Sequence, residues 1–83
     1  MPYLKKDDRD RLNSGGTPTD SGSLNYVLTN ICLRYIHRHT PDVRYKDYND
    51  VIGALEACKL ELYARAVRPY EDQKIKENGD VYN

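Results

Sequence analysis

The sequence predicts an all-α fold, an antiparallel helical hairpin with a short C-terminal helix that is completed by oligomerisation. Three observations lead to this fold class. Apolar residues recur three and four positions apart through two long stretches, no strand-like alternation of useful length appears, and Gly and Pro residues separate the helical stretches. The 83 residues are expected to form a single small helical domain, 1–83, with one flexible loop at 13–23.

The N-terminal segment is short and charged. Residues 4–12 are expected to form one or two helical turns, in which Asp7 and Arg11 have the i,i+4 spacing of a helical ion pair. The next residues, NSGGTPTDSGS at 13–23, have the Gly, Ser, Thr and Pro content that is typical of a flexible, solvated loop.

The first long helix is expected to run from Ser23, a suitable N-cap, to about Arg38. Thr40-Pro41 ends the helix, because the residue before a proline avoids the helical region. A second, weaker apolar face around Leu33 also needs a partner. The main stripe, which is expected to face the core, consists of Leu24, Val27, Leu28, Ile31, Cys32 and Tyr35.

The second long helix is expected to start at Asp47 or Asn49, both good caps, and to continue to about Arg68. It has two apolar stripes, roughly 120° apart. A hairpin partner covers only one of them, so the C-terminal helix, the chain termini or another subunit must cover the other. Small residues at 53, 57 and 64 leave room there for a neighbouring backbone. The first stripe holds Val51, Leu55, Cys58 and Leu62, and the second holds Ile52, Leu60, Tyr63 and Val67.

A separate short helix is expected from Pro69 to the Asn78-Gly79 stop. Proline suits the first helical position, and the acidic residues come early and the basic residues late, as the helix dipole favours. A kinked continuation of the preceding helix is the alternative. Apolar residues at both termini, in 2–4 and 80–82, are expected to dock on the body of the protein or on a neighbouring subunit.

The composition predicts a small binding protein. All eight aromatic residues are tyrosines, and Tyr and Arg are enriched where proteins contact their partners. The 13 basic and 13 acidic residues balance, which argues against general nucleic-acid binding. No signal peptide or membrane helix is expected, so we predict a cytosolic protein, in which Cys32 and Cys58 are reduced and buried as small apolar residues.

The densest group of candidate ligand-binding residues spans the end of the first long helix, the following loop and the start of the second. A hairpin gathers such residues at one tip, where Arg can bind phosphate or carboxylate and Tyr and His rings can stack on a base. The alternative is that these cations only complement the dipole of a helix C-terminus. The candidates are Arg34, His37, Arg38, Arg44, Tyr45 and Tyr48, together with Tyr26 on the weaker face.

A second and smaller candidate group consists of Arg65, Arg68 and Tyr70, at the far end of the second long helix. An antiparallel hairpin places that end near the start of the first long helix, whose free N–H groups favour anions. In a symmetric oligomer the two cationic groups can meet across an interface and form one site.

Catalysis and metal binding are not expected. His37 and His39 project roughly 200° apart on a helix and cannot share a metal ion there. Cys32 lies within an apolar stripe, and neither a Ser-His-acid arrangement nor a pair of carboxylates at helical spacing stands out. Glu56, among the apolar residues of the second stripe, is expected to be solvated at a rim or paired at an interface. We therefore predict no enzyme activity, no metal and no cofactor.

Four stretches are distinctive: Met1-Pro2-Tyr3, Leu24-Asn25-Tyr26 with Thr29, NDVIGALEACKLELY at 49–63 and PYEDQKIKENGDVY at 69–82. Together they resemble an uncharacterised family of short proteins from phages, prophages and bacteria. The resemblance covers most of the chain outside 13–23 and 36–46 and brings no catalytic residue with it. It implies a small intracellular accessory protein, associated with phages, that acts by binding.

The leading hypothesis is a homo-oligomer that sequesters a small anionic ligand, such as a nucleotide immune signal, at a site rich in Tyr and Arg. The alternative is an inhibitor or adaptor that binds a host protein through an exposed apolar and Tyr-bearing helical face. A structure-specific nucleic-acid binder is the third hypothesis, and it predicts a steep dependence of affinity on salt.

Overall fold

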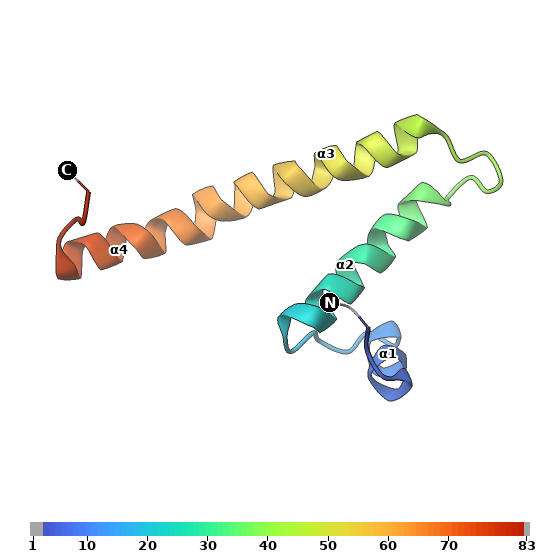
Figure 1. Cartoon of the computed structure of the whole chain (residues 1–83), viewed down its shortest axis with the longest axis horizontal. Coiled ribbons are helices and arrows are strands. Elements are labelled where there is room, and N and C mark those ends of the chain that lie inside the picture. Colours follow the sequence, from blue (N-terminus) through green and yellow to red (C-terminus); the bar gives the residue numbers. More distant parts are fainter. Residues whose placement is uncertain (1–2, 83) are drawn as a thin grey trace. The chain divides into compact units, whose positions relative to one another are not determined.

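The computed structural model describes residues 3–82, and within this range every regular element is helical, which confirms the all-α prediction. The chain divides into two units, residues 1–48 and 49–83, which are described separately below. The elements, labelled in Figure 1 except for η1, are α1 (Lys6–Asn13), α2 (Ser21–Ile36), α3 (Tyr45–Leu62), the π-helical turn η1 (Tyr63–Val67) and α4 (Arg68–Asn78).

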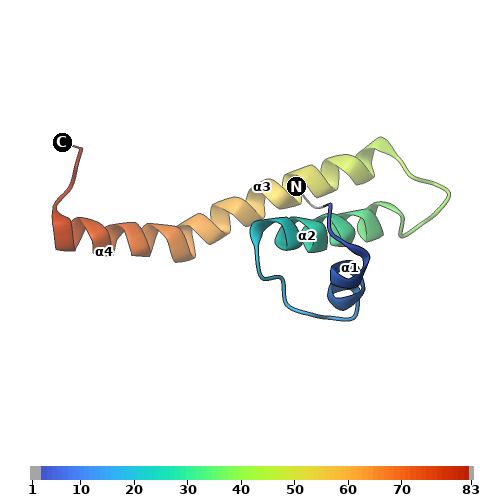
Figure 2. The same ribbon diagram turned by 60° about the horizontal axis from the view of Figure 1, so that its bottom comes forward.

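In α1, the charged residues pair differently from the expected Asp7–Arg11 ion pair. Lys6 Nζ lies 2.8 Å from Asp10 Oδ2, while Arg11 Nη1 donates to the carbonyl oxygen of Thr17 at 3.0 Å. Arg11 therefore ties the loop after α1 back to the helix. Leu12, near the end of α1, is buried, and Figure 2 shows α1 lying alongside α2.

Two glycines shape the turn that leaves α1. Gly15 adopts φ +96°, a conformation that glycine tolerates best. The N–H of Gly16 donates to the carbonyl of Arg11 at 2.9 Å. A Cβ at Gly16 would lie 2.8 Å from that same oxygen, so a larger residue would force the backbone apart. The flexibility of segment 13–23 remains a prediction.

Helix α2 begins with a capping box, and its N-cap is Asp20 rather than the predicted Ser23. The N–H of Ser23 donates to Asp20 Oδ1 at 2.7 Å, and Ser23 Oγ accepts from the N–H groups of Asp20 and Thr19 at 3.1 and 3.0 Å. Ser23 is only 4% exposed. Asp and Ser are both good N-cap residues. With Asp20 as the cap, Ser23 lies three residues later, where its hydroxyl can accept from the N–H groups of Asp20 and Thr19 in return.

The Asp20 carboxylate makes the start of α2 sensitive to acid. The backbone N–H of Ser23, followed by its hydroxyl, lowers the pKa of Asp20 below its ordinary value. Because the folded pKa lies below the unfolded pKa, the stabilisation is present above the unfolded pKa and is lost as the pH falls through the folded one. We expect the amide chemical shift of Ser23 to report this loss as the solution is acidified below the ordinary pKa of an aspartate. Asp20→Asn, which keeps a capping side chain, should abolish the change, and its persistence in that variant would contradict the assignment.

The stripe of α2 that was expected to face the core is not buried. Leu24, Leu28, Ile31 and Tyr35 are exposed, and the buried residues of α2 are Ser23 and Ile36. Within the N-terminal unit the only other complete helix, α1, has eight residues and is too short to cover the sixteen of α2. Cys32 and Cys58 are free thiols, as predicted, but Cys32 is only partly buried and Cys58 is exposed, so the prediction of their burial is wrong.

The connection between α2 and α3 is held by Asp47. Helix α2 ends at Ile36, before the predicted Arg38, and α3 begins at Tyr45, before either predicted cap. Asp47 acts from within the first turn of α3: Oδ2 accepts from the N–H of Arg44 at 2.9 Å, and Oδ1 lies 3.1 Å from Arg38 Nη2.

In the C-terminal unit, residues 49–78 form one uninterrupted helical run (Figure 1), so the last helix continues the preceding one, as in the predicted alternative, and the predicted kink stays a prediction. The π-turn allows the helical run to continue through Pro69. Proline has no N–H, and its ring clashes with the carbonyl four residues earlier in a regular α-helix. The N–H of Arg68 instead donates to the carbonyl of Tyr63, five residues back, which widens the turn ahead of the proline.

The run ends as predicted at Gly79, whose φ is +83° and whose N–H donates to the carbonyl of Ile75 at 2.7 Å. The terminal anchors differ from expectation. Tyr3, Val81 and Tyr82 are almost fully exposed, so these residues are not buried on the chain itself. Pro2 lies outside the described residues, and docking on a neighbouring subunit remains a prediction.

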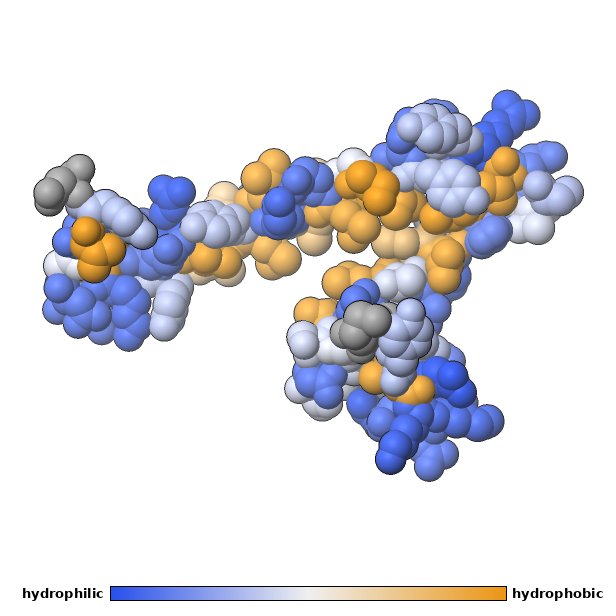
Figure 3. Space-filling model, in the orientation of Figure 1, coloured by the Kyte–Doolittle hydropathy of each residue, from blue (hydrophilic) through white to orange (hydrophobic). Residues whose placement is uncertain are grey.

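The C-terminal unit exposes much apolar surface. Figure 3 shows hydrophobic side chains over α3 and η1, whereas hydrophilic side chains dominate α4. Among residues 49–82, no second helix packs on this run, so its apolar side chains find no helical partner within the unit. No helix in the described residues is long and apolar enough to cross a membrane. The large exposed residues of the run up to η1 are Ile52, Leu55, Leu60, Leu62, Tyr63 and Val67.

Candidate functional site

The N-terminal unit contains an open groove of about 610 Å³ where the end of α1 meets α2. This volume lies within the range of small-molecule sites. The lining is mixed, with four aliphatic side chains, two amides, one phenol and two basic groups. These are Leu12, Asn13, Tyr26, Val27, Asn30, Ile31, Leu33, Arg34 and His37.

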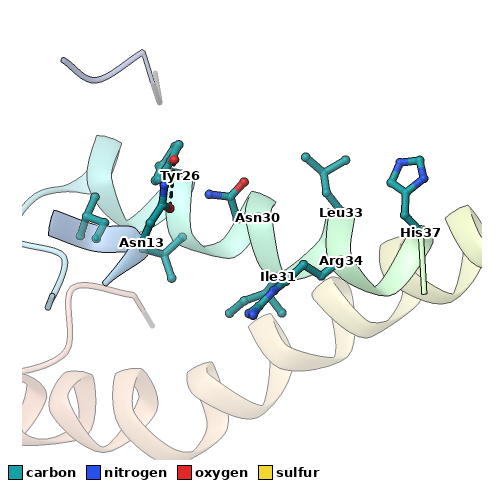
Figure 4. Close-up of a pocket in the computed structure, with 9 residues that line it drawn as sticks. Asn13, Tyr26, Asn30, Ile31, Leu33, Arg34 and His37 are labelled. Atoms are coloured by element: carbon teal, nitrogen blue, oxygen red, sulfur yellow. Dashed lines mark hydrogen bonds between the residues drawn. The ribbon is translucent and has the colours of Figure 1, made fainter. Parts of the chain in front are cut away.

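Helical periodicity sets how α2 presents these residues. In Figure 4, Asn30, Leu33 and His37 project to one side of α2, while Ile31 and Arg34 project to the other. The two basic groups therefore flank the groove rather than converge on one point.

The end of the groove next to α1 is joined to α2 by a hydrogen bond. The Tyr26 hydroxyl donates to Asn13 Oδ1 at 3.1 Å (Figure 4), so the predicted Tyr26 lies in the groove with its hydroxyl already engaged. The ring of Tyr26 remains available as an apolar wall.

Arg34 and His37 are the predicted basic residues that reach this groove. Neither side chain has a hydrogen-bond or ion-pair partner among residues 3–82. Both also lie at the C-terminal end of α2, where a cation complements the helix dipole. The structure thus leaves two donors uncommitted beside an apolar surface.

Arg38, by contrast, is committed to the fold. Its Nη1 donates to the carbonyl of Tyr35 at 2.7 Å, its Nη2 pairs with Asp47, and its guanidinium carbon lies 3.8 Å from the centroid of the Tyr35 ring. For Arg38 these contacts favour the structural alternative over ligand binding.

The other predicted residues of the first cluster do not line the groove. Arg44 uses its backbone N–H to bind Asp47, and its side chain has no partner in the described part of the chain. Tyr45 and Tyr48 are exposed.

The second predicted cluster lies in the C-terminal unit, and its members interact locally. Arg65 Nε pairs with Glu61 Oε2 at 2.6 Å. The guanidinium of Arg68 lies 5.7 Å from the ring centroid of Tyr63, and Lys74 Nζ lies 5.7 Å from that of Tyr70. These are exposed contacts of small energy, so they leave the cations able to bind elsewhere.

Sequence reasoning missed six of the nine groove residues: it assigned Val27 and Ile31 to the core stripe and Leu33 to the weaker apolar face, and it did not single out Leu12, Asn13 and Asn30. Asn30 carries a readable signal, because it lies four residues after Tyr26 and seven before His37 on the same helical face. Leu12 and Asn13 give no such signal, since only the fold brings the end of α1 to α2.

The described residues contain no group of three or more His, Cys, Asp or Glu side chains that could hold a metal ion. Residues 1–81 match a protein family described as a "Domain of unknown function (DUF6899)". No curated protein and no solved structure matches the chain.

Proposed function

The chain belongs to the DUF6899 family, and we propose that it binds a small anionic ligand of the nucleotide class in the groove of its N-terminal unit. The observation that carries the proposal is the pair of uncommitted basic side chains, Arg34 and His37, at a groove whose other walls are mainly apolar.

The lining matches the parts of such a ligand. The planar fork of Arg34 suits a phosphate, while His37, on the opposite side of α2, offers a donor to another part of the ligand. Leu33, Ile31 and the ring of Tyr26 offer apolar surface to a base or ribose. The Asn13 and Asn30 amides supply the hydrogen bonds that fix a base edge.

The wider proposal follows the sequence hypothesis. The protein acts by sequestration rather than catalysis, as a phage-associated homo-oligomer in the host cytosol, and needs no cofactor. The antiparallel hairpin of its long helices stays a prediction. A nucleotide immune signal is the proposed ligand because the resemblance to short phage and prophage proteins suggests a role in countering host defence.

Isothermal titration against a panel of cyclic and ADP-ribose-type nucleotides tests the proposal. We expect one of them to bind, and Arg34→Ala to weaken that binding by roughly 10- to 100-fold, because it removes a charged hydrogen bond. Arg44→Ala is the matched control, with the same loss of charge in the same unit but outside the groove, and should bind as the wild type does. No heat with any nucleotide, or equal losses in the two variants, would refute the proposal.

The exposed apolar side chains of α3 and η1 favour a second candidate, a protein-binding inhibitor or adaptor. A host protein recovered at a stoichiometric ratio, by a pull-down that survives nuclease and removal of small molecules, would support it. Loss of that partner in Leu60→Asp but not in Arg34→Ala would separate it from nucleotide binding.

A further inference from the structure

The groove of the N-terminal unit is formed by two helices of very different length. Leu12 and Asn13 come from the end of α1, and the other seven lining residues come from α2 or its C-cap. Figure 4 shows Asn13 beside Tyr26 at this junction. One wall of the groove therefore exists only while the end of α1 lies against α2.

Helix α1 is too short to be stable by itself. It has eight residues, whereas isolated helices need about 12–15 residues to be even marginally stable in water. Its N-cap, Lys5, makes no side-chain capping hydrogen bond to any of residues 3–82, so the first turn lacks this support. Contacts outside the helix must therefore stabilise α1.

Two contacts hold the end of α1 on α2, and both belong to the groove. The Leu12 side chain is only 6% exposed, although every other residue of α1 is exposed, and it lines the groove together with Val27. Next to it, the Tyr26 hydroxyl donates to Asn13 Oδ1 at 3.1 Å. The residues that hold α1 on α2 are thus the ones that a bound molecule would contact.

The hydrogen bonds of the turn after α1 do not join α1 to α2. Arg11 Nη1 donates to the carbonyl of Thr17 at 3.0 Å, and the N–H of Gly16 donates to the carbonyl of Arg11 at 2.9 Å. Both bonds connect α1 with its own loop and involve no residue of α2. They therefore allow α1 and this turn to leave α2 together.

We propose that α1 is the closing wall of the groove: a nucleotide binds only while α1 is packed on α2, so ligand binding and the packing of α1 stabilise each other. The coupling arises because a ligand that contacts both helices has a lower affinity for the open state, in which one set of contacts is missing. This inference rests on the proposed function and adds how access to its site is controlled.

The first experiment measures amide hydrogen exchange of the full chain without nucleotide. The probes are the N–H groups of Arg9, Ser14 and Gly16, which donate within α1 and the turn after it. We expect Leu12→Ala to speed their exchange by at least about tenfold, because it removes the buried side chain that holds α1. Leu28→Ala is the matched control, since Leu28 is 41% exposed on α2 and does not line the groove, and it should leave these rates unchanged.

Tyr26→Phe is a milder variant that keeps the apolar packing. It removes only the hydroxyl and should speed the exchange of the same N–H groups by about two- to fivefold. The N–H of Leu24, which donates to the Asp20 carbonyl at 3.0 Å at the start of α2, should exchange at the wild-type rate in each variant. Unchanged exchange of the α1 probes in both Leu12→Ala and Tyr26→Phe would mean that α1 does not depend on α2, which would overturn the proposal.

The second experiment adds cyclic AMP, cyclic di-GMP and ADP-ribose, one at a time, and follows the same N–H groups. At a concentration about tenfold above its dissociation constant, a nucleotide that binds only the closed state should slow the exchange of Ser14 and Gly16 by about tenfold. A nucleotide that binds to α2 alone would leave both rates unchanged and would overturn the coupling.

Failure of this inference can be told apart from failure of the proposed function. A nucleotide that binds through Arg34 but does not slow exchange in α1 would overturn the closing wall alone. No heat with any nucleotide in isothermal titration would refute the proposed function and, with it, the coupling that rests on it.

Discussion

Arg38→Ala is expected to lower the free energy of unfolding by about 2 kcal/mol. The substitution removes the hydrogen bond to the Tyr35 carbonyl, the stacking on the Tyr35 ring and the ion pair with Asp47. The Asp47 side chain is only 13% exposed and that of Arg38 34%, so the carboxylate would lose a partner in a partly desolvated place. Chemical denaturation of the full chain, followed by far-UV circular dichroism, gives the value.

Two companion substitutions make the test specific. Arg38→Lys keeps the charge but loses the planar fork and the stacking, so an intermediate loss of stability is expected. Arg44→Ala removes an arginine side chain without a partner in the described residues and should change stability by less than about 0.5 kcal/mol. If Arg38→Ala lowers the free energy of unfolding as little as Arg44→Ala does, the contacts at Asp47 do not stabilise the connection between α2 and α3.

Pro69→Ala is expected to convert the π-turn into regular α-helix and to raise helix stability by about 1–3 kcal/mol. Alanine restores an N–H that can donate to the carbonyl of Arg65 and removes the ring that prevents this bond. Far-UV circular dichroism during thermal unfolding would show the gain. An unchanged or lower stability would mean that contacts of the π-turn outweigh the propensity of alanine.

The same substitution should also change the titration of Tyr63. The hydroxyl of Tyr63 donates to Glu71 Oε1 at 2.6 Å across the π-turn, and this hydrogen bond, together with the charge of Glu71, raises the pKa of Tyr63. Because the folded pKa is the higher one, the stabilisation is present below the unfolded pKa and is lost as the pH rises through the folded pKa. In a regular helix, eight residues span about 12 Å, so the bond should break in Pro69→Ala and the pKa should fall. Glu71→Gln should lower the pKa with the turn intact, and ultraviolet titration distinguishes the two variants.

Most helical elements of this protein can be predicted from its amino-acid sequence. Apolar spacing predicts the two long helical stretches, and Asn78-Gly79 marks the stop that Gly79 makes with its positive φ. Arg34, His37 and Tyr26 were predicted as candidates from residue chemistry alone, and the structure places all three at one groove. Each of these inferences depends on neighbours within one or two helical turns.

The errors arise where two local solutions compete. Asp20 and Ser23 are both good caps, and the reciprocal hydrogen bonds that decide between them involve atoms that a residue pattern does not place. The ligand-binding role of Arg38 stays a prediction, but its ion pair with Asp47, nine residues later, could not be read from the residue pattern. The burial predicted for the stripe of α2 assumed that another element covers it. Periodicity identifies an apolar face but does not show whether such an element is present.

The double use of Asp47 also has an evolutionary consequence. One oxygen of its carboxylate pairs with the side chain of Arg38, while the other accepts a hydrogen bond from the backbone N–H of Arg44. Among relatives, positions 38 and 47 should therefore change together or not at all. Position 44 can accept any residue that keeps an N–H, so proline is the one substitution that this contact forbids.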